Sequence, residues 1–276
     1  MTVLQDIIAG VREDLDARRR TLPLEELKVR AAAAPRALDG FAALGGGRDE
    51  RPDLRVIAEV KRRSPSKGEL AGIADPAALA GRYAAGGASV ISVLTEERRF
   101  GGSLADLDAV RAAVDIPVLR KDFTCDPYMI WEARAHGADL VLLIVAALDD
   151  GELRDCLALT HELGMDAIVE THTAGEIARA VAVGARIIGI NVRNLKTLAV
   201  DRSTFAALAG NIPAGPVVIA ESGVRDAGDV RHYAAHGANA VLVGEALVRD
   251  ATPRERITEF RQAGAEAIAA LRLGTH

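Results

Sequence analysis

Charged and amide side chains follow five of the short apolar runs in this sequence, at the points where those runs end. They are Glu59 and Lys61, Lys121, Glu170, Asn191 and Arg193, and Glu221 with Ser222. A charged group beside buried apolar residues is costly unless it is paired or used. Lysines and glutamates held close together also shift one another's pKa values, so that a lysine acid and a glutamate base can both work near neutral pH. The set therefore predicts general acid–base chemistry, whereas any one member alone is better explained as a loop ion pair.

Two kinds of loop beside these residues indicate an anionic substrate. The loop at residues 61–70 carries Ser64, Ser66 and four cations, and it is a candidate lid over an anion. A solvated basic turn is the alternative for this loop. Glycine-containing loops also follow the last two apolar runs, at 221–223 and 243–246. In a barrel these are the loops that commonly bind phosphate, although the glycines could merely turn the chain.

Eight apolar runs must supply the strands that position these side chains. They are residues 55–60, 89–94, 116–121, 139–144, 166–170, 187–191, 217–221 and 240–244. The runs are rich in Val, Ile and Leu, as expected of strands buried on both faces. Helical stretches separate them, and a Gly-Ala pair precedes every second run at intervals of about 50 residues, which indicates an internal repeat. We therefore predict an α/β fold, a (β/α)8 TIM barrel. An open doubly wound sheet, which would use fewer strands, is the competing fold.

The first 48 residues are predicted to form a helical extension ahead of the barrel. Apolar residues recur at helical spacing between Val3 and Leu15, and a second helical stretch follows Leu22-Pro23. The glycines at 45–47 and Arg51-Pro52 interrupt this pattern, so the barrel is expected to begin near Leu54. A length of 276 residues accommodates one barrel with such an extension, and we predict a single domain over 1–276.

Composition argues against several classes of protein. The net charge of −5 does not favour nucleic-acid binding, and no apolar run is long enough to span a membrane. Two cysteines without metal-ligand spacing are typical of a reduced, cytoplasmic protein, and Cys125 is expected to be inert. The histidines share no ligand spacing, and Trp131 lies on a helical apolar face that we expect to pack in the core. We therefore expect no metal, no nucleic acid and no membrane.

Six sequence motifs resemble the indole-3-glycerol phosphate synthase family, and its actinobacterial members in particular. The motifs are IAEVKRRSPSKG (57–68), SVLTEERRFGGS (92–103), VLRKDF (118–123), GINVRNL (189–195), AESGV (220–224) and VLVGEALV (241–248). The resemblance implies an enzyme of tryptophan biosynthesis, a carboxy-lyase that needs no cofactor. Its reaction would close the indole ring of 1-(2-carboxyphenylamino)-1-deoxyribulose 5-phosphate with loss of CO2 and water.

The same resemblance implies a role for each matching position. Lys121 would be the general acid and Glu170 the general base, while Lys61 would contact the substrate and its phosphate and share the acid duty. Glu59 and Asn191 would orient the substrate hydroxyls and the lysines. Further substrate contacts would come from Ser64, Ser66, Leu94, Phe123, Arg193 and Ser222. Of these, Leu94 and Phe123 would pack against the aromatic ring, and Arg193 would bind its carboxylate. Backbone groups of Ser222, Gly223, Gly244 and Glu245 would bind the phosphate, and the N-terminal helices would cover part of the barrel mouth.

One segment departs from the family pattern, and two other functions remain open. The stretch THTAGE, residues 171–176, follows Glu170 where the family carries a more acidic or Val-containing sequence. A sister barrel isomerase acting on a related phosphorylated aminosugar is the second hypothesis, and a non-catalytic phosphate-binding scaffold is the third. The small phosphorylated substrate is the expected partner, and we expect a monomer, with a weak dimer as the alternative.

Overall fold

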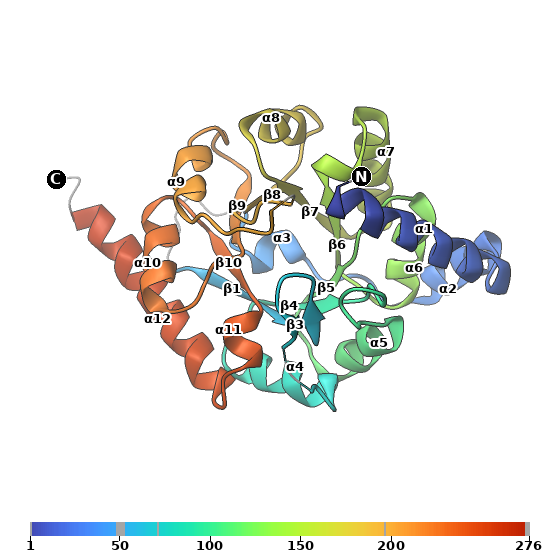
Figure 1. The fold of residues 1–276 in the computed structure, drawn as a ribbon, viewed down its shortest axis with the longest axis horizontal. Coiled ribbons are helices and arrows are strands. Elements are labelled where there is room, and N and C mark those ends of the chain that lie inside the picture. The colour runs from blue at the N-terminus through green and yellow to red at the C-terminus, as the bar shows by residue number, and fades with distance from the viewer. Residues whose placement is uncertain (1, 48–52, 71, 196, 274–276) are drawn as a thin grey trace.

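The eight apolar runs form eight parallel strands that close into a barrel (Figure 1). The computed structural model describes residues 2–47, 53–70, 72–195 and 197–273. Around the barrel the strands lie in the order β1-β10-β9-β8-β7-β6-β5-β4, and β10 pairs with β1. They are β1 (Arg55–Val60), β4 (Val90–Leu94), β5 (Val118–Lys121), β6 (Leu140–Ile144), β7 (Asp166–Thr171), β8 (Ile187–Asn191), β9 (Val217–Glu221) and β10 (Ala240–Val243). The predicted (β/α)8 barrel is confirmed, and the open sheet is wrong.

Five of the strands differ in their boundaries from the predicted runs, and two of these differences have reasons that lie in the backbone. The strand expected over 116–121 begins at Val118, because Pro117 has no N–H to donate to the ladder. The carbonyl of Pro117 still accepts a hydrogen bond of 3.0 Å from the N–H of Ile91. The last strand ends at Val243 because the next residue, Gly244, precedes the short helix α11 (Glu245–Val248) and turns the chain.

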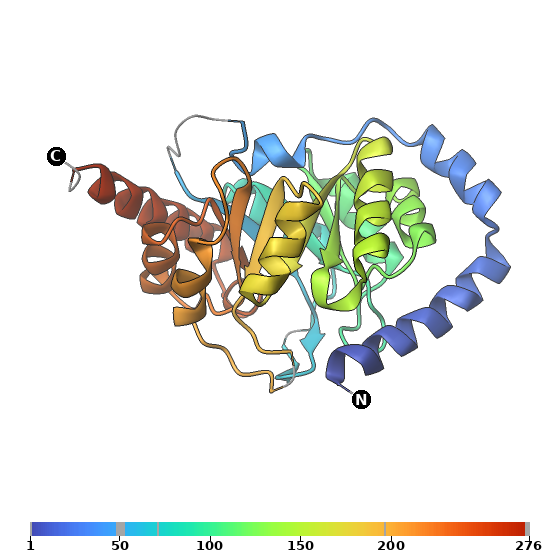
Figure 2. The same cartoon turned by 90° about the horizontal axis from the view of Figure 1, so that it is seen from above.

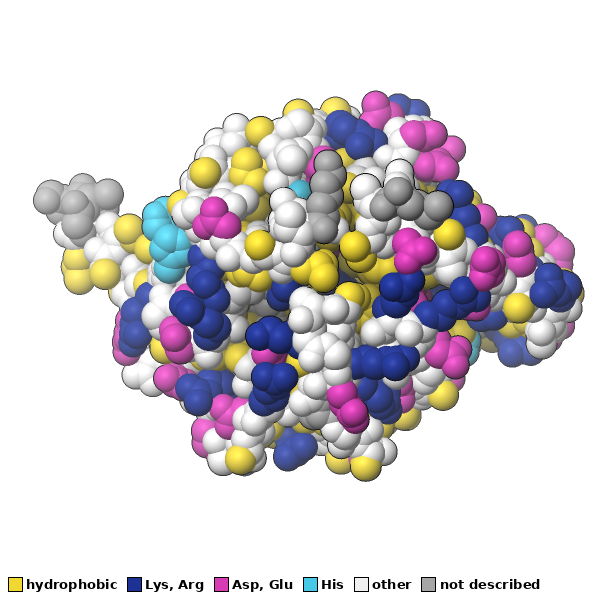
Figure 3. Space-filling view, in the orientation of Figure 1, with side chains coloured by type: hydrophobic (Ala, Val, Ile, Leu, Met, Phe, Trp, Pro, Cys, Tyr) yellow, Lys and Arg dark blue, Asp and Glu magenta, His cyan; other side chains and the backbone are white. Residues whose placement is uncertain are grey.

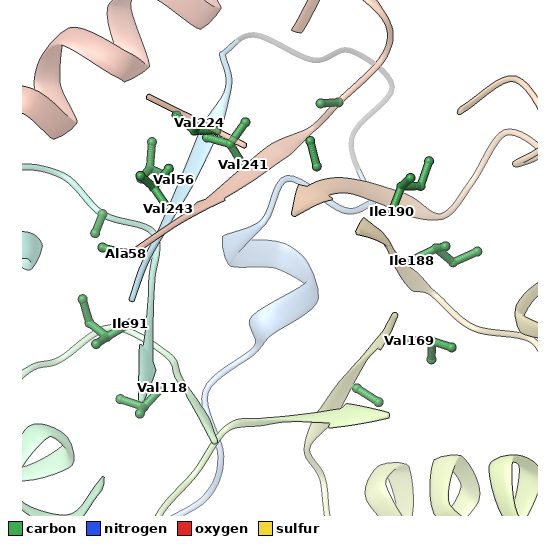
Figure 4. Packing of buried hydrophobic residues seen from close by; sticks show 14 of the residues in the cluster. Val56, Ala58, Ile91, Val118, Val169, Ile188, Ile190, Val224, Val241 and Val243 are labelled. Carbon is green, nitrogen blue, oxygen red and sulfur yellow. The ribbon is translucent and has the colours of Figure 1, made fainter. Parts of the chain in front are cut away.

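Alternate residues of each strand point to opposite faces, which divides the core into two layers. Side chains that point outward pack beneath the surrounding helices, as Figure 4 shows for Val56, Ala58, Ile91, Val118, Val169, Ile188 and Val241. Side chains that point inward fill the barrel, among them Ile57, Val90, Leu119, Leu140, Ile168, Ile187 and Ile219. The interior of the barrel is therefore a packed core and not a channel.

Helices on the outside of the barrel alternate with the strands. They are α4 (Pro76–Ala85), α5 (Leu104–Ala113), α6 (Pro127–Ala135), α7 (Asp150–Glu162), α8 (Ala174–Ala182), α9 (Ser203–Ala209), α10 (Ala227–Ala235) and α12 (Pro253–Leu273), with a 3-10 turn η1 (Val145–Ala147). Most begin with a side-chain cap on a backbone N–H, from Asp75, Ser103, Asp126, Asp149, Thr173 and Asp226. Among the described helices, none combines the length and apolar character needed to span a membrane.

Among the described residues ahead of the barrel there are three helices: α1 (Val3–Thr21), α2 (Leu24–Ala33) and α3 (Gly40–Ala43). Figure 2 shows α3 at the end of the barrel opposite the small hairpin of β2 (Arg63–Ser64) and β3 (Gly68–Glu69). The N–H of Phe41 donates to Asp166 at 2.9 Å, and the N–H of Leu38 donates to Asp139 at 2.8 Å. With fully buried Leu44, this segment closes the amino end of the barrel. The predicted boundary at residue 48 and the Arg51-Pro52 pair lie outside the described residues.

Helix α1 is held against the side of the barrel near its open end. Ile7, Val11 and Leu15 pack with Tyr128 and Met129 of α6. Ion pairs add to this contact, from Arg18 to Glu132 at 2.8 Å and from Arg98 to Asp14 at 2.7 Å. Trp131 packs at the edge of this cluster and is half-buried, so it belongs to the seam between α6 and the extension and not to the barrel core.

Replacing Leu44 with alanine is expected to lower the free energy of unfolding by about 2–5 kcal/mol. The side chain is fully buried against the inner barrel cluster, so its loss leaves a cavity at the amino end of the barrel. Urea unfolding followed by circular dichroism measures the change. Val29→Ala is the matched control, because Val29 is 69% exposed and should change stability by less than about 0.5 kcal/mol. An unchanged unfolding midpoint in Leu44→Ala would mean that α3 does not seal the barrel.

Candidate active site

The carboxyl ends of the strands open into a cavity of about 930 Å³. Every site residue predicted from the sequence lines it: Glu59, Lys61, Ser64, Ser66, Leu94, Lys121, Phe123, Glu170, Asn191, Arg193, Ser222, Gly223, Gly244 and Glu245. On the face that carries this opening, dark blue Lys and Arg side chains gather around the centre (Figure 3). The structure thus brings together residues that are spread over almost two hundred positions of the chain.

Lys121 lies between two buried glutamates at the floor of the cavity. Its Nζ is 2.7 Å from Oε2 of Glu221 and 3.2 Å from Oε2 of Glu170. Burial alone would lower the pKa of Lys121, but the charges of Glu221, Glu170 and Glu59 raise it above its ordinary value. The ammonium group is therefore held protonated, as a general acid must be before it reacts.

The two glutamates that flank Lys121 have opposite pKa shifts. Burial raises the pKa of Glu170, yet the charges of Lys121 and His172 and hydrogen bonds from Glu221 and Asn191 bring it below its ordinary value. For Glu221, burial and the neighbouring charge of Glu170 outweigh Lys121 and raise the pKa to about 7. Near neutral pH Glu170 is therefore a carboxylate, and Glu221 can hold a proton. The sequence placed Glu221 on this rim but gave it no role.

Two glycines make room for the side chains of Glu221 and Glu59. A Cβ added at Gly189 of β8 would lie closer than 3.0 Å to Oε1 of Glu221 on the next strand. A Cβ added at Gly244 would clash in the same way with Oε1 of Glu59, which forms an ion pair with Lys61. A larger residue at either position would displace a buried charge, so the absence of a side chain there positions the neighbouring glutamate.

Gly189→Ala is expected to lower kcat by roughly 10–100-fold, the range expected when a catalytic group is misplaced by about 1 Å. The new methyl group would push the Glu221 carboxylate away from its position beside Lys121. Steady-state kinetics together with thermal unfolding measures the effect. Gly81→Ala in α4 is the control, because an added Cβ there meets no atom within 4 Å. Equal kcat values for the two variants would contradict this account of Gly189.

One end of the cavity is built for an anion. Ser222 has φ 69° and Gly223 has φ 81°, a left-handed backbone that costs energy at a non-glycine residue such as Ser222. The hydroxyl of Tyr233 donates to the Ser222 carbonyl at 3.2 Å, and Nε of Arg202 donates to the Gly223 carbonyl at 2.6 Å. Arg202, Arg225 and Arg249 line the cavity here together with Lys61. The three arginines were missed in the sequence because nothing local marks them as facing the mouth.

The opposite end of the cavity is apolar. The rings of Phe100 and Phe123 lie 5.9 Å apart, and Leu94, Leu142 and Ile144 complete the wall. Residues Val3, Leu4 and Ile7 of α1 also line the cavity, which confirms that the extension covers part of the mouth. This end can accept a planar aromatic ring, and Phe100 and the α1 residues are contacts that the sequence did not single out.

The loop at 61–70 is tethered across the mouth and is not a free basic turn. Arg62 forms an ion pair with Asp106, and Arg63 donates to the carbonyl of Arg98 at 3.0 Å. Nη1 of Arg193 donates to Ser66 Oγ at 3.4 Å and to the Leu198 carbonyl at 2.9 Å. Arg193, which lies in the loop after β8, therefore joins that loop to the loop at 61–70. In the strand order, β8 lies across the barrel from β4, the strand that carries Leu94.

Among the residues that the structure describes, neither a reactive cysteine nor a metal-binding cluster is indicated near the site. Burial raises the pKa of the Cys125 thiol, which disfavours the reactive thiolate. Within the described part of the chain, no group of three His, Cys, Asp or Glu side chains is arranged to hold a metal ion. His172 was given no role from the sequence, yet its Nε2 lies 3.5 Å from Oε1 of Glu170.

Comparison with known proteins shows the family of this chain. The family model described as indole-3-glycerol phosphate synthase matches residues 4–260. The indole-3-glycerol phosphate synthase of Arthrobacter sp. (strain FB24) is 74% identical over 270 residues, which cover 98% of this chain and 99% of that protein. The synthase of Micrococcus luteus is 64% identical over 263 residues, covering 95% and 98% of the two chains.

Solved structures with lower identity share the fold. The crystal structure of a 3-hexulose-6-phosphate synthase superposes with a TM-score of 0.62 at 20% identity, covering 76% of this chain and 99% of that one. Structural similarity at this level of sequence identity shows the barrel fold alone. The match over most of the chain, and the high identity to relatives of nearly equal length, show that this chain belongs to the indole-3-glycerol phosphate synthase family.

Proposed function

We propose that Lys121, Glu170 and Glu221 carry the acid–base chemistry of indole ring closure in this chain. The protein is an indole-3-glycerol phosphate synthase, a carboxy-lyase of tryptophan biosynthesis. Its reaction converts 1-(2-carboxyphenylamino)-1-deoxyribulose 5-phosphate to indole-3-glycerol phosphate with loss of CO2 and water. The observation that carries the assignment is the position of Lys121, whose ammonium group lies between two buried glutamates at the cavity floor.

The shape of the cavity supports one orientation of the substrate. The aromatic ring would lie against Phe123, Phe100 and Leu94 at the apolar end. The phosphate would bind at the other end, where backbone groups of Ser222, Gly223, Gly244 and Glu245 meet Lys61 and the arginines. Arg193, Ser64 and Ser66 would close over the bound substrate and contact its carboxylate. The reacting carbons would then lie between the two ends, over Lys121 and Glu170.

In this orientation each step has a group placed to perform it. Attack of the ring carbon on the ribulosyl carbonyl puts negative charge on the carbonyl oxygen, and Lys121 would protonate that oxygen. Loss of CO2 then restores the aromatic ring. Dehydration needs an acid on the departing hydroxyl and a base for the departing proton, which would be Lys121 and Glu170.

Other residues would support the two central groups. Glu221, 2.7 Å from the Lys121 ammonium, would return a proton to Lys121 between the two acid steps. Lys61, held by Glu59, would share the acid duty, and Glu59 and Asn191 would orient the substrate hydroxyls and the lysines.

The alternatives are less well supported by this arrangement. A non-catalytic phosphate-binding scaffold would have no use for two carboxylates and a lysine buried together, since such a cluster is costly to desolvate. A sister isomerase is disfavoured by the α1 residues that cover the cavity and by the loop at 61–70 that also lines it.

We propose further that the protein acts as a monomer in the cytoplasm, as one domain over residues 1–276. Both cysteines are free and buried, as expected in a reducing compartment. The net charge of −5 gives no support to a nucleic-acid partner. Sedimentation velocity at micromolar concentration distinguishes the monomer from the weak dimer.

The activity is tested by incubating the purified protein with 1-(2-carboxyphenylamino)-1-deoxyribulose 5-phosphate and following indole fluorescence. We expect saturable product formation without an added metal or cofactor. Folded protein that yields no fluorescent product would overturn the assignment. Turnover of phosphoribosyl anthranilate in a parallel assay would favour the isomerase instead.

A further inference from the structure

We propose that His172 is a positioning residue for Glu170: it holds one oxygen of this carboxylate from behind, and is itself held by Glu176. The inference rests on the proposed role of Glu170 as the base. It goes beyond that role because His172 does not line the cavity and has no direct access to the substrate.

The two oxygens of Glu170 face two different basic side chains. Oε2 lies 3.2 Å from Nζ of Lys121, on the side of the cavity floor. Oε1 lies 3.5 Å from Nε2 of His172, the residue that follows β7. Nε2 is buried and makes no hydrogen bond among the described residues, so Glu170 is the acidic group left to pair with it. The carboxylate is therefore held from both sides.

His172 is in turn fixed by the first turn of α8. Oε2 of Glu176 accepts a hydrogen bond of 2.8 Å from the backbone N–H of His172 and lies 3.2 Å from Nδ1 of its ring. The N–H of Glu176 donates to Oγ1 of Thr173, the capping residue of α8. An acidic partner on one ring nitrogen orients the imidazole and directs the other nitrogen, as in many sites where a carboxylate supports a functional histidine.

The charges that face His172 come from three elements. They belong to Glu170 on β7, Glu176 on α8 and Glu221 on β9. Burial alone would lower the pKa of His172, but these three carboxylates and the hydrogen bond to Glu176 raise it. A cationic imidazole behind Glu170 would keep the carboxylate ionised. It would also prevent Glu170 from turning fully onto Lys121, a position in which the base could not reach the substrate.

The test compares His172→Gln with Glu176→Ala and with the double variant. We expect kcat to fall roughly 10–100-fold in His172→Gln, the range typical of a group that supports a functional residue, with KM changed by less than about 2-fold. Glutamine cannot carry a positive charge, so on this proposal the apparent pKa of Glu170 should rise and the acid limb of the kcat profile should move to higher pH. Glu176→Ala should show a smaller loss of the same kind, and the double variant should lose little more than His172→Gln, because the residues act in series.

Controls separate this inference from other causes. His236→Gln changes an exposed histidine at the end of α10 and should leave kcat and the pH profile unchanged. Thermal unfolding is measured for each variant, and if His172→Gln does not fold, Glu176→Ala tests the same chain of contacts. Normal kcat at all pH values in the folded variants, or fully additive losses in the double variant, would overturn the inference. Glu170→Gln is run in parallel: if it keeps full activity, the proposed base is wrong, whereas an inactive Glu170→Gln beside a normal His172→Gln defeats only the positioning role.

Discussion

Replacing Lys121 with methionine is expected to lower kcat by roughly 10²–10⁴-fold, the contribution of a positioned general acid. Methionine has a similar length but neither proton nor charge, so both acid steps would depend on water or on Lys61. The loss in kcat should exceed that from removing the acid alone. The reason is that Glu170 and Glu221 would then face one another without the Lys121 cation that now lies between them. Loss of that positive charge would raise the pKa of Glu170, so the base would be weakened together with the acid.

Lys121→Arg separates the two contributions of this residue. Arginine keeps the positive charge between the glutamates but does not give up its proton at working pH. We therefore expect Lys121→Arg to remain folded and to bind substrate, yet to stay within about 10-fold of the methionine variant in kcat. Lys28→Met is the control, because Lys28 does not line the cavity: it lies on α2, where it pairs with Glu25 and lies over the Trp131 ring. Near-normal turnover in Lys121→Met, measured by indole fluorescence, would transfer the acid role to Lys61.

Glu170→Gln is expected to lower kcat by roughly 10²–10⁴-fold as well, because glutamine cannot accept the proton that dehydration releases. Glutamine keeps the size of the side chain and one oxygen, so binding should be little affected. Glu221→Gln is the matched comparison, since it removes the other carboxylate of the same lysine. We expect the loss in Glu221→Gln to be the smaller of the two. The opposite ranking in steady-state kinetics would assign the base to Glu221.

The raised pKa of Glu221 also predicts how stability depends on pH. The folded chain holds this proton up to a pH of about 7, whereas an unfolded glutamate releases it near its ordinary value, so the folded state binds more protons between these limits. The stability gained in this way is fully present below the unfolded pKa and is lost as the pH rises toward 7. Urea unfolding at pH 5 and pH 7.5 should show this loss in the wild type and a smaller one in Glu221→Gln. Identical pH slopes would show that Glu221 is not protonated in the folded chain.

Much of the site could be predicted from the sequence because strand ends in a parallel barrel meet at one mouth. Each apolar run marks a strand, and the first polar residues after it must lie at the open end. This reasoning placed Glu59, Lys121, Glu170 and Asn191 around one cavity, and all of them line it. Strand boundaries were less certain, since a single residue such as Pro117 decides where the ladder of hydrogen bonds begins.

The sequence by itself determined which residues reach the mouth of the barrel, and only the tertiary structure decided which of them pair. Lys121 is 49 residues from Glu170 and 100 residues from Glu221, and nothing local in the chain indicates that both carboxylates meet its ammonium group. That meeting depends on the closure and register of the barrel, which also placed His172 behind Glu170, Gly189 beside Glu221 and Leu44 at the far end. Periodicity fixes the face from which a side chain projects, whereas its partners are set by packing between strands that are distant in the chain.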